Sequence, residues 1–205
     1  MQIIYNASTL TLEDMPLDVG YASERVTLKN NAGETFTIGG QNGATQLLIS
    51  VPFIDDPLIT QLHEINTLLS LNALGGITKA LIVANNQHKL PEMEEWLVGY
   101  DYDEAFGDYY GIRLSNKELA KSLFILSKDG AVFYHEILND LNAPFSFDKA
   151  LVKISAAQSL LYGERVSRVS RDDIFVPLLP PIFKILQIRL NYSYLIQEHK
   201  MQSSL

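Results

Sequence analysis

The chain has 205 residues, of which 47% are hydrophobic and 20% are charged, so it holds enough apolar material for one compact domain with an extension. Its formal net charge of −8 at pH 7 disfavours nucleic acid or an anionic membrane as the main ligand, because both would be repelled by the overall field. It contains no cysteine, which excludes disulfides, thiolate metal sites and thiol chemistry in this chain.

Neither the first residues nor the most apolar stretch has the pattern of a targeting or membrane segment. The start, MQIIYNASTLTLED, lacks a basic region and a sustained apolar run, so it does not predict a signal peptide. Residues 175–190 are interrupted by three prolines and by Lys184 and Arg189, which makes them too broken for a membrane span. We therefore expect a cytoplasmic protein that does not insert into membranes.

The first part of the chain predicts strands and one long helix. Alternating apolar and polar residues predict short β segments at 3–6, 9–12 and 24–38, the last of which turns around Asn30–Gly33. The apolar run 46–51 predicts a buried strand, and apolar residues at helical spacing predict an amphipathic helix over 57–71. Residues 80–85, ALIVAN, predict a second buried strand.

The next part predicts two helices, a loop and a hairpin. Pro91 followed by early acidic residues predicts a helix over 90–100, and 101–111 reads as an acidic, aromatic loop. Two β runs, 122–127 and 131–137, flank a Lys-Asp-Gly turn and predict a hairpin. Residues 145–161 predict a closing helix.

This order of elements predicts an α/β fold, with a mixed sheet that has helices on both sides. The arrangement is thioredoxin-like, with an N-terminal β-hairpin in front. We expect residues 1–155 to form this domain, and residues 156–205 to form a partly helical, apolar C-terminal extension.

Three segments carry motifs in the order and spacing of one family. The first, 52–59, reads PFIDDPLI in the frame P-x-x-D-T-P-x-C. The second, 106–111, reads FGDYYG, like F-G-x-x-Y-G, and the third, 119–130, reads LAKSLFILSKDG, like L-A-R-A-x-F-V-I-D-x-D-G. From about residue 2 to 155 the chain resembles the atypical two-cysteine thiol peroxidases of the peroxiredoxin superfamily. The resemblance implies a peroxiredoxin-type fold and a homodimer.

The same resemblance implies that the catalytic groups are missing. The position of the peroxidatic cysteine is Ile59, and that of the threonine that would hold peroxide and thiolate is Asp56, whose charge would repel a thiolate. Lys121 stands in place of the arginine, and the resolving cysteine falls near Leu97. Peroxide reduction needs a thiolate nucleophile, a cation beside it and a polar donor. We therefore expect a pseudoenzyme that uses no cofactor.

Histidines and acids give no metal-binding pattern in this sequence. The four histidines lack the spacing of a metal site; they are His63, His88, His135 and His199. Four acids at 101–108 lack the spacing and turn glycine of a calcium loop and fit a solvated loop better; they are Asp101, Asp103, Glu104 and Asp108. Of the pair Asp55 and Asp56, we expect one to cap the helix that starts at Pro57.

Partner-binding residues are predicted in two places. In the extension, Arg165, Arg168 and Arg171 form a basic stripe that either balances nearby acids or meets an acidic partner. An apolar segment follows that must cover the domain itself, a twin subunit or another protein; its main residues are Phe175, Leu178, Leu179, Ile182, Phe183 and Leu186. The second place is the loop with Phe106, Tyr109 and Tyr110, where core packing and an interface both stay open.

The leading hypothesis is a catalytically dead thiol-peroxidase-like protein that acts as a protein-interaction, scaffold or chaperone-like factor through its extension. The alternative is small-molecule binding or non-thiol chemistry in the former peroxidatic pocket, through Asp55, Asp56 and Lys121. A weaker third option is a stability module within a larger complex. A ligand-sized cavity on which these three side chains converge would favour the alternative, and Ile59 filling that space would count against it.

Overall fold

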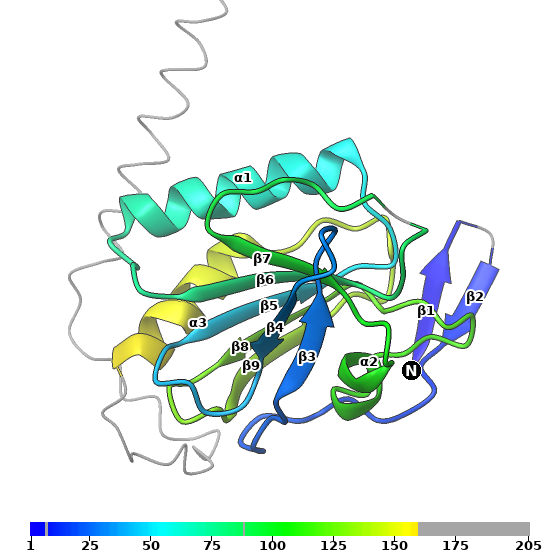
Figure 1. Cartoon of the computed structure of the whole chain (residues 1–205), viewed down its shortest axis with the longest axis horizontal. Coiled ribbons are helices and arrows are strands. Elements are labelled where there is room, and N and C mark those ends of the chain that lie inside the picture. Colours follow the sequence, from blue (N-terminus) through cyan, green and yellow to red (C-terminus); the bar gives the residue numbers. More distant parts are fainter. Residues whose placement is uncertain (7, 88, 160–205) are drawn as a thin grey trace, which may run out of the picture. The chain divides into compact units, whose positions relative to one another are not determined.

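Two β-sheets organise the computed structural model, which describes residues 1–6, 8–87 and 89–159 (Figure 1). A small antiparallel hairpin pairs β1 (Gln2–Tyr5) with β2 (Ser8–Thr11). A seven-stranded mixed sheet has the order β4-β3-β7-β6-β5-β8-β9. Its strands are β3 (Val26–Lys29), β4 (Thr35–Ile38), β5 (Gln46–Ser50), β6 (Thr78–Val83), β7 (Trp96–Tyr100), β8 (Ser122–Leu126) and β9 (Val132–Ile137). The predicted α/β class and N-terminal hairpin are confirmed.

Strand β5 lies inside the large sheet, between parallel β6 and antiparallel β8. Every residue of β5 is buried, because both faces of the sheet are covered at this point. Such a strand must be apolar throughout rather than alternating, which explains the unbroken run Leu47, Leu48 and Ile49. Alternate side chains still serve opposite faces, since Leu47 and Ile49 belong to one core cluster and Leu48 to the other.

Two long helices cover one face of this sheet. Helix α1 (Asp56–Leu71) and helix α3 (Phe147–Ser159) both contribute buried residues to the core cluster that contains Leu47. On the other face the second core cluster includes Phe106 of the short helix α2 (Ala105–Tyr109) and Ile3 of β1. Figure 1 shows α2 next to the β1–β2 hairpin. Helices do lie on both sides, as predicted, but α2 supplies the second side, and α3 continues beyond residue 155.

The predicted helix over 90–100 is wrong. Residues 96–100 form β7, which pairs with β6 in parallel and meets β3 at Tyr100. Glu95, immediately before the strand, has φ of +64°, which a helix does not accept. At Gly99 a Cβ atom would come within 2.7 Å of the Phe36 ring, so the strand is fitted to its neighbours. Sheet pairing has overridden a helix-like run of local residues.

The segment expected to be a solvated acidic loop contains α2 and a buried ion pair. The Asp101 carboxylate is 1% exposed and accepts hydrogen bonds from the backbone N–H groups of Phe106 and Gly107. The Arg113 guanidinium, also buried, lies 3.2 Å from Asp101 and 2.6 Å from Asp108. It also donates to the carbonyl oxygen of Glu104. Three of the four acids at 101–108, Asp101, Glu104 and Asp108, therefore lie around an arginine of the same chain.

Replacing Arg113 by methionine should destabilise the fold, because it leaves the buried Asp101 carboxylate without its cation. We expect the free energy of unfolding to fall by about 3–5 kcal/mol. Chemical denaturation monitored by circular dichroism measures this loss.

The matched control is Lys117→Met, which removes the ion pair between Lys117 and Glu13. The Lys117 side chain is 64% exposed, so we expect a much smaller loss than for Arg113→Met, because solvent screens an exposed ion pair. Equal losses in the two variants would contradict a special role for the buried pair.

Candidate functional site

Residues 51–59 lead from the end of β5 into α1. Asp55 is the N-cap of α1, and its Oδ1 accepts a hydrogen bond from the Leu58 backbone N–H at 2.8 Å. Pro57 occupies the first turn, where its missing N–H is not needed. The prediction that one aspartate caps this helix is therefore confirmed for Asp55, whereas Asp56 is exposed in the first turn. Both carboxylates sit where the helix dipole favours negative charge.

Ile59 lies on the first turn of α1 and faces the core. Its side chain is half-buried and packs, as Ile54 does, against the apolar cluster between the sheet and the two long helices. The position therefore contributes apolar contacts to the fold. An aliphatic side chain also has no atom that can ionise or attack a substrate.

Lys121 reaches the same end of the sheet from the segment before β8. It is 7% exposed, and its Nζ donates to the carbonyl oxygens of Ala143 at 2.7 Å and Leu141 at 3.4 Å. The ammonium also lies 5.3 Å from the centre of the Phe145 ring, within range of a cation–π contact. Burial lowers the pKa of Lys121, while the charges of Asp55 and Asp140 act in the opposite direction.

The pairing of β5 with β8 brings Lys121 to this place. Ser50 ends β5 and stands opposite Ser122, the first residue of β8. The Ser50 hydroxyl lies 2.6 Å from the Ser122 hydroxyl and donates to the Ala120 carbonyl at 2.7 Å. These buried bonds fix the backbone on both sides of Lys121. The sheet register thus sets the position of the lysine, and the Asp55 carboxylate is near enough to act on its pKa.

Comparison with known proteins gives a consistent result. No protein-family model matches the chain. It is 26% identical over 147 residues to a thiol peroxidase from Campylobacter jejuni, a match that covers 67% of this chain and 83% of that protein. Its fold is peroxiredoxin-like.

Two solved structures share this fold. A peroxiredoxin-like protein from Aquifex aeolicus superposes with a TM-score of 0.66 at 17% identity, over 76% of this chain and 96% of that one. A thiol peroxidase from Chromobacterium violaceum superposes with a TM-score of 0.63 at 12% identity, over the same shares of the two chains. At these identities the likeness concerns the fold alone.

Leu97 does not join the other predicted positions. It lies on β7 opposite Ala80 of β6. Its side chain packs on the second core cluster, whereas Ile59 packs on the first, so the two lie on opposite faces of the sheet. The prediction that Leu97 lies on a helix is wrong, because residues 96–100 form a strand. Ile59 and Leu97 are therefore not neighbours in this structure.

The predicted partner-binding residues have separate placements. Phe106 and Tyr110 are fully buried and stack at 4.4 Å between ring centres, while Tyr109 is 55% exposed. Of these three, only Tyr109 presents a large exposed surface. The remaining candidates lie outside the described residues; they are Arg165, Arg168, Arg171, Phe175, Leu178, Leu179, Ile182, Phe183 and Leu186.

Within residues 1–6, 8–87 and 89–159, no group of three or more acids or histidines is arranged to hold a metal ion. Over the same part of the chain, no helix is long and apolar enough to cross a membrane. His63 is exposed on α1, and His135 lies on β9 with its ring against Phe124. His88 and His199 lie outside the described residues.

Sequence reasoning missed two buried cations. Arg113 follows the acidic segment by a few residues, so four acids and one arginine in thirteen positions were an available signal of an internal ion pair. Lys79 interrupts the start of an otherwise apolar strand, and only the structure shows that its ammonium borders a cavity. From sequence alone, a charged residue near the first or last position of a buried strand predicts that the strand reaches solvent there.

The lowered pKa of Lys121 predicts a pH dependence of stability. Between the folded and unfolded pKa values the unfolded chain binds more protons at this site, so the free energy of unfolding rises with pH in that window. We expect the wild-type protein to gain stability relative to Lys121→Met as the pH rises from 7 toward the ordinary lysine pKa of 10.5. Urea unfolding at several pH values measures the difference.

Lys121→Arg is the control. Arginine keeps its charge throughout this pH range, so this variant, like Lys121→Met, should not become more stable through deprotonation at this position. Parallel stability curves for the wild type and both variants would contradict the assignment.

Proposed function

We propose that this peroxiredoxin-like protein does not reduce peroxides and acts as a protein-interaction, scaffold or chaperone-like factor. One observation carries the first half of the proposal. The position of the nucleophile holds Ile59, whose side chain packs against the core. Because the chain has no cysteine, it offers no thiolate of its own to attack a peroxide.

The cation at the site supports the same conclusion. A peroxidase needs a positive charge directed at the thiolate and at the peroxide oxygen. Lys121 instead donates to two backbone carbonyl oxygens of the 141–143 segment. The lysine thus holds that segment against the start of β8, which is a structural task. Asp55 likewise uses a carboxylate oxygen to cap α1.

The interaction half of the proposal rests on the sequence after α3. Residues 175–186 combine many large apolar side chains with few charges, and Arg165, Arg168 and Arg171 precede them in a protein of net charge −8. A basic stripe beside an apolar segment suits a partner that offers both acidic and apolar surface. A second copy of this chain is one such partner, and the resemblance to two-cysteine peroxidases implies a homodimer.

The alternative, ligand binding through Asp55, Asp56 and Lys121, finds less support. Ile59 occupies the neighbouring core, Asp55 is a helix cap, and Lys121 already has two acceptors. The mutual attraction of Asp55 and Lys121 places them in electrostatic reach. A site for acid–base chemistry would need a group that is free to exchange a proton with a substrate.

Peroxide assays on cysteine variants test the catalytic half. The wild-type chain should consume hydrogen peroxide, with dithiothreitol as reductant, no faster than a heat-inactivated sample. In Ile59→Cys the Asp56 carboxylate should hold the thiol pKa up, so alkylation by iodoacetamide at pH 7 should be slow. Asp56→Thr with Ile59→Cys should alkylate about tenfold faster, as a pKa difference of about one unit implies.

Alkylation at pH 10 is the internal control, since both thiols should then react at similar rates. Peroxide turnover by the wild-type chain would sink the proposal that it is inactive. Equal alkylation of the single and double variants at pH 7 would contradict the role given to Asp56.

Quantitative affinity capture from the source-cell lysate tests the interaction half. The full chain is compared with a version that ends at Ser159, which retains all of α3. We expect a protein that is retained by the full chain and lost with the truncation, and lost as well when Arg165, Arg168 and Arg171 are all changed to glutamate. Circular dichroism checks that each variant is folded. Identical captured sets for the full and truncated chains would remove the extension as the binding element.

A further inference from the structure

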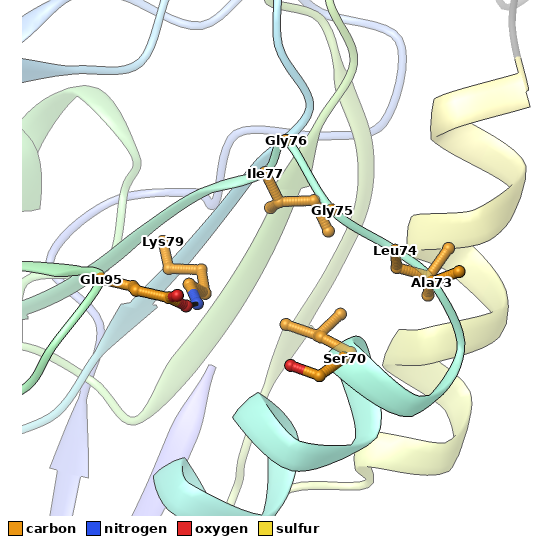
Figure 2. A pocket seen from close by; sticks show the side chains of 9 residues that line it. Ser70, Ala73, Leu74, Gly75, Gly76, Ile77, Lys79 and Glu95 are labelled. Carbon is orange, nitrogen blue, oxygen red and sulfur yellow. Dashed lines mark hydrogen bonds and ion pairs between the residues drawn. The ribbon is translucent and has the colours of Figure 1, made fainter.

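A cavity of about 470 Å³ lies at the C-terminal end of α1, the opposite end from the Asp55 cap (Figure 2). Its walls are the last turn of α1, the loop 73–77, Lys79 of β6 and Glu95 before β7. The size falls within the roughly 300–1,000 Å³ that is typical of small-molecule sites. None of the positions discussed for the former peroxidase site lines it.

Hydrogen bonds hold the wall of this cavity in place. After α1 ends, the Leu74 backbone N–H donates to the Leu69 carbonyl at 3.0 Å, which closes the helix terminus. Gly76 has φ of +70° and turns the chain toward β6. The Gln158 side chain of α3 donates to the Gly75 carbonyl at 2.8 Å. The loop is therefore tied to two helices, and the cavity is formed before any ligand arrives.

The lining combines apolar side chains with polar groups, and one cation borders it. Leu69 is buried, and Leu74 and Ile77 are half-buried and pack on the first core cluster. The Lys79 side chain is 10% exposed, and its Nζ lies 2.8 Å from Oε2 of Glu95, whose side chain is 69% exposed. Figure 2 shows the charged ends of Lys79 and Glu95 together on one side of the cavity, with Ala73 and Leu74 on the other.

The Lys79 ammonium has capacity for a further acceptor. An ammonium group carries three N–H donors. Among the described residues, Glu95 and Asn66 accept two of them. A hydrogen bond from Lys79 lowers the pKa of the Glu95 carboxyl, with its positive charge acting in the same direction. The Lys79 ammonium thus stabilises the ionised form of a carboxyl group that lies next to it.

We propose that the cavity binds a small amphiphilic monocarboxylate, with its carboxylate at Lys79 and its apolar body against Leu69, Leu74 and Ile77. Lys79 is the one cation in the lining, which matches a single negative charge. The side chains of Leu69, Leu74 and Ile77 match a hydrocarbon body. Glu95 occupies the carboxylate position in the free protein. Because the Glu95 side chain is 69% exposed, it can move into solvent when a ligand carboxylate takes its place at Lys79.

The chain carries its own reporter for this site. Trp96 is the single tryptophan, it pairs with Lys79 across β6 and β7, and its ring centre lies 5.9 Å from the Lys79 Nζ. Movement of the ammonium toward a ligand changes the charge next to the indole. Indole fluorescence should therefore respond to binding without any label.

The experiment titrates the full chain at pH 7 with sodium octanoate, and compares octylamine and octanol, which share the hydrocarbon body. Trp96 fluorescence and isothermal titration calorimetry follow binding. We expect saturable binding of octanoate, weaker binding of octanol and none of octylamine. Lys79→Met should bind octanoate about tenfold more weakly, as expected for loss of a charged hydrogen bond. Glu95→Gln should bind it about threefold more tightly, because the competing ion pair is gone.

Absence of saturable octanoate binding by the wild-type chain would overturn the proposal. Equal binding of octanoate and octylamine, or equal octanoate affinity in the wild type and Lys79→Met, would do the same, because either would show apolar partitioning without recognition of the carboxylate. Circular dichroism checks the fold of each variant. If Lys79→Met unfolds, Glu95→Gln decides the matter, since its affinity must then exceed that of the wild type.

Discussion

The antiparallel pairing of β5 with β8 is the contact on which the site depends. It joins two fully buried strands and ends at the bonded serines Ser50 and Ser122. At that point the chain leaves β5 for the loop that caps α1, and it enters β8 directly after Lys121. A shift of one residue in this register would exchange the faces of every side chain on β8. The electrostatic interaction between Lys121 and Asp55 would then be lost.

The residues at the positions that resemble the peroxidase motif have structural tasks that do not require chemistry. Asp55 closes the N-terminus of α1, Ile59 adds apolar contacts to the core, and Lys121 ties a distant segment to the sheet. Each of these interactions stabilises the folded chain whether or not a peroxide is present. This part of the structure therefore does not depend on a thiol, and the chain contains none. A site of this kind can be kept by selection for folding alone.

Three buried cations show three ways to stabilise a positive charge inside an acidic protein. Arg113 is surrounded by carboxylates, and its planar guanidinium can bind several at once. Lys121 relies on carbonyl oxygens and an aromatic ring. Lys79 has one exposed carboxylate and one amide as partners and borders an open cavity. The first two are enclosed by their own chain, whereas the third has a partner that solvent or a ligand can replace.

The sequence by itself determined most of the elements, because their patterns are local. The run 46–51, the helical spacing over 57–71 and the turn at Lys128–Gly130 each report a short-range preference that the fold retains. The motif order predicted that Ile59, Asp56 and Lys121 belong to one site. Only the tertiary structure decided that 96–100 is a strand, since its partners β6 and β3 lie outside this segment. The same holds for the burial of Arg113 and Lys79, because a charge is accepted inside a protein only where distant residues supply its partners.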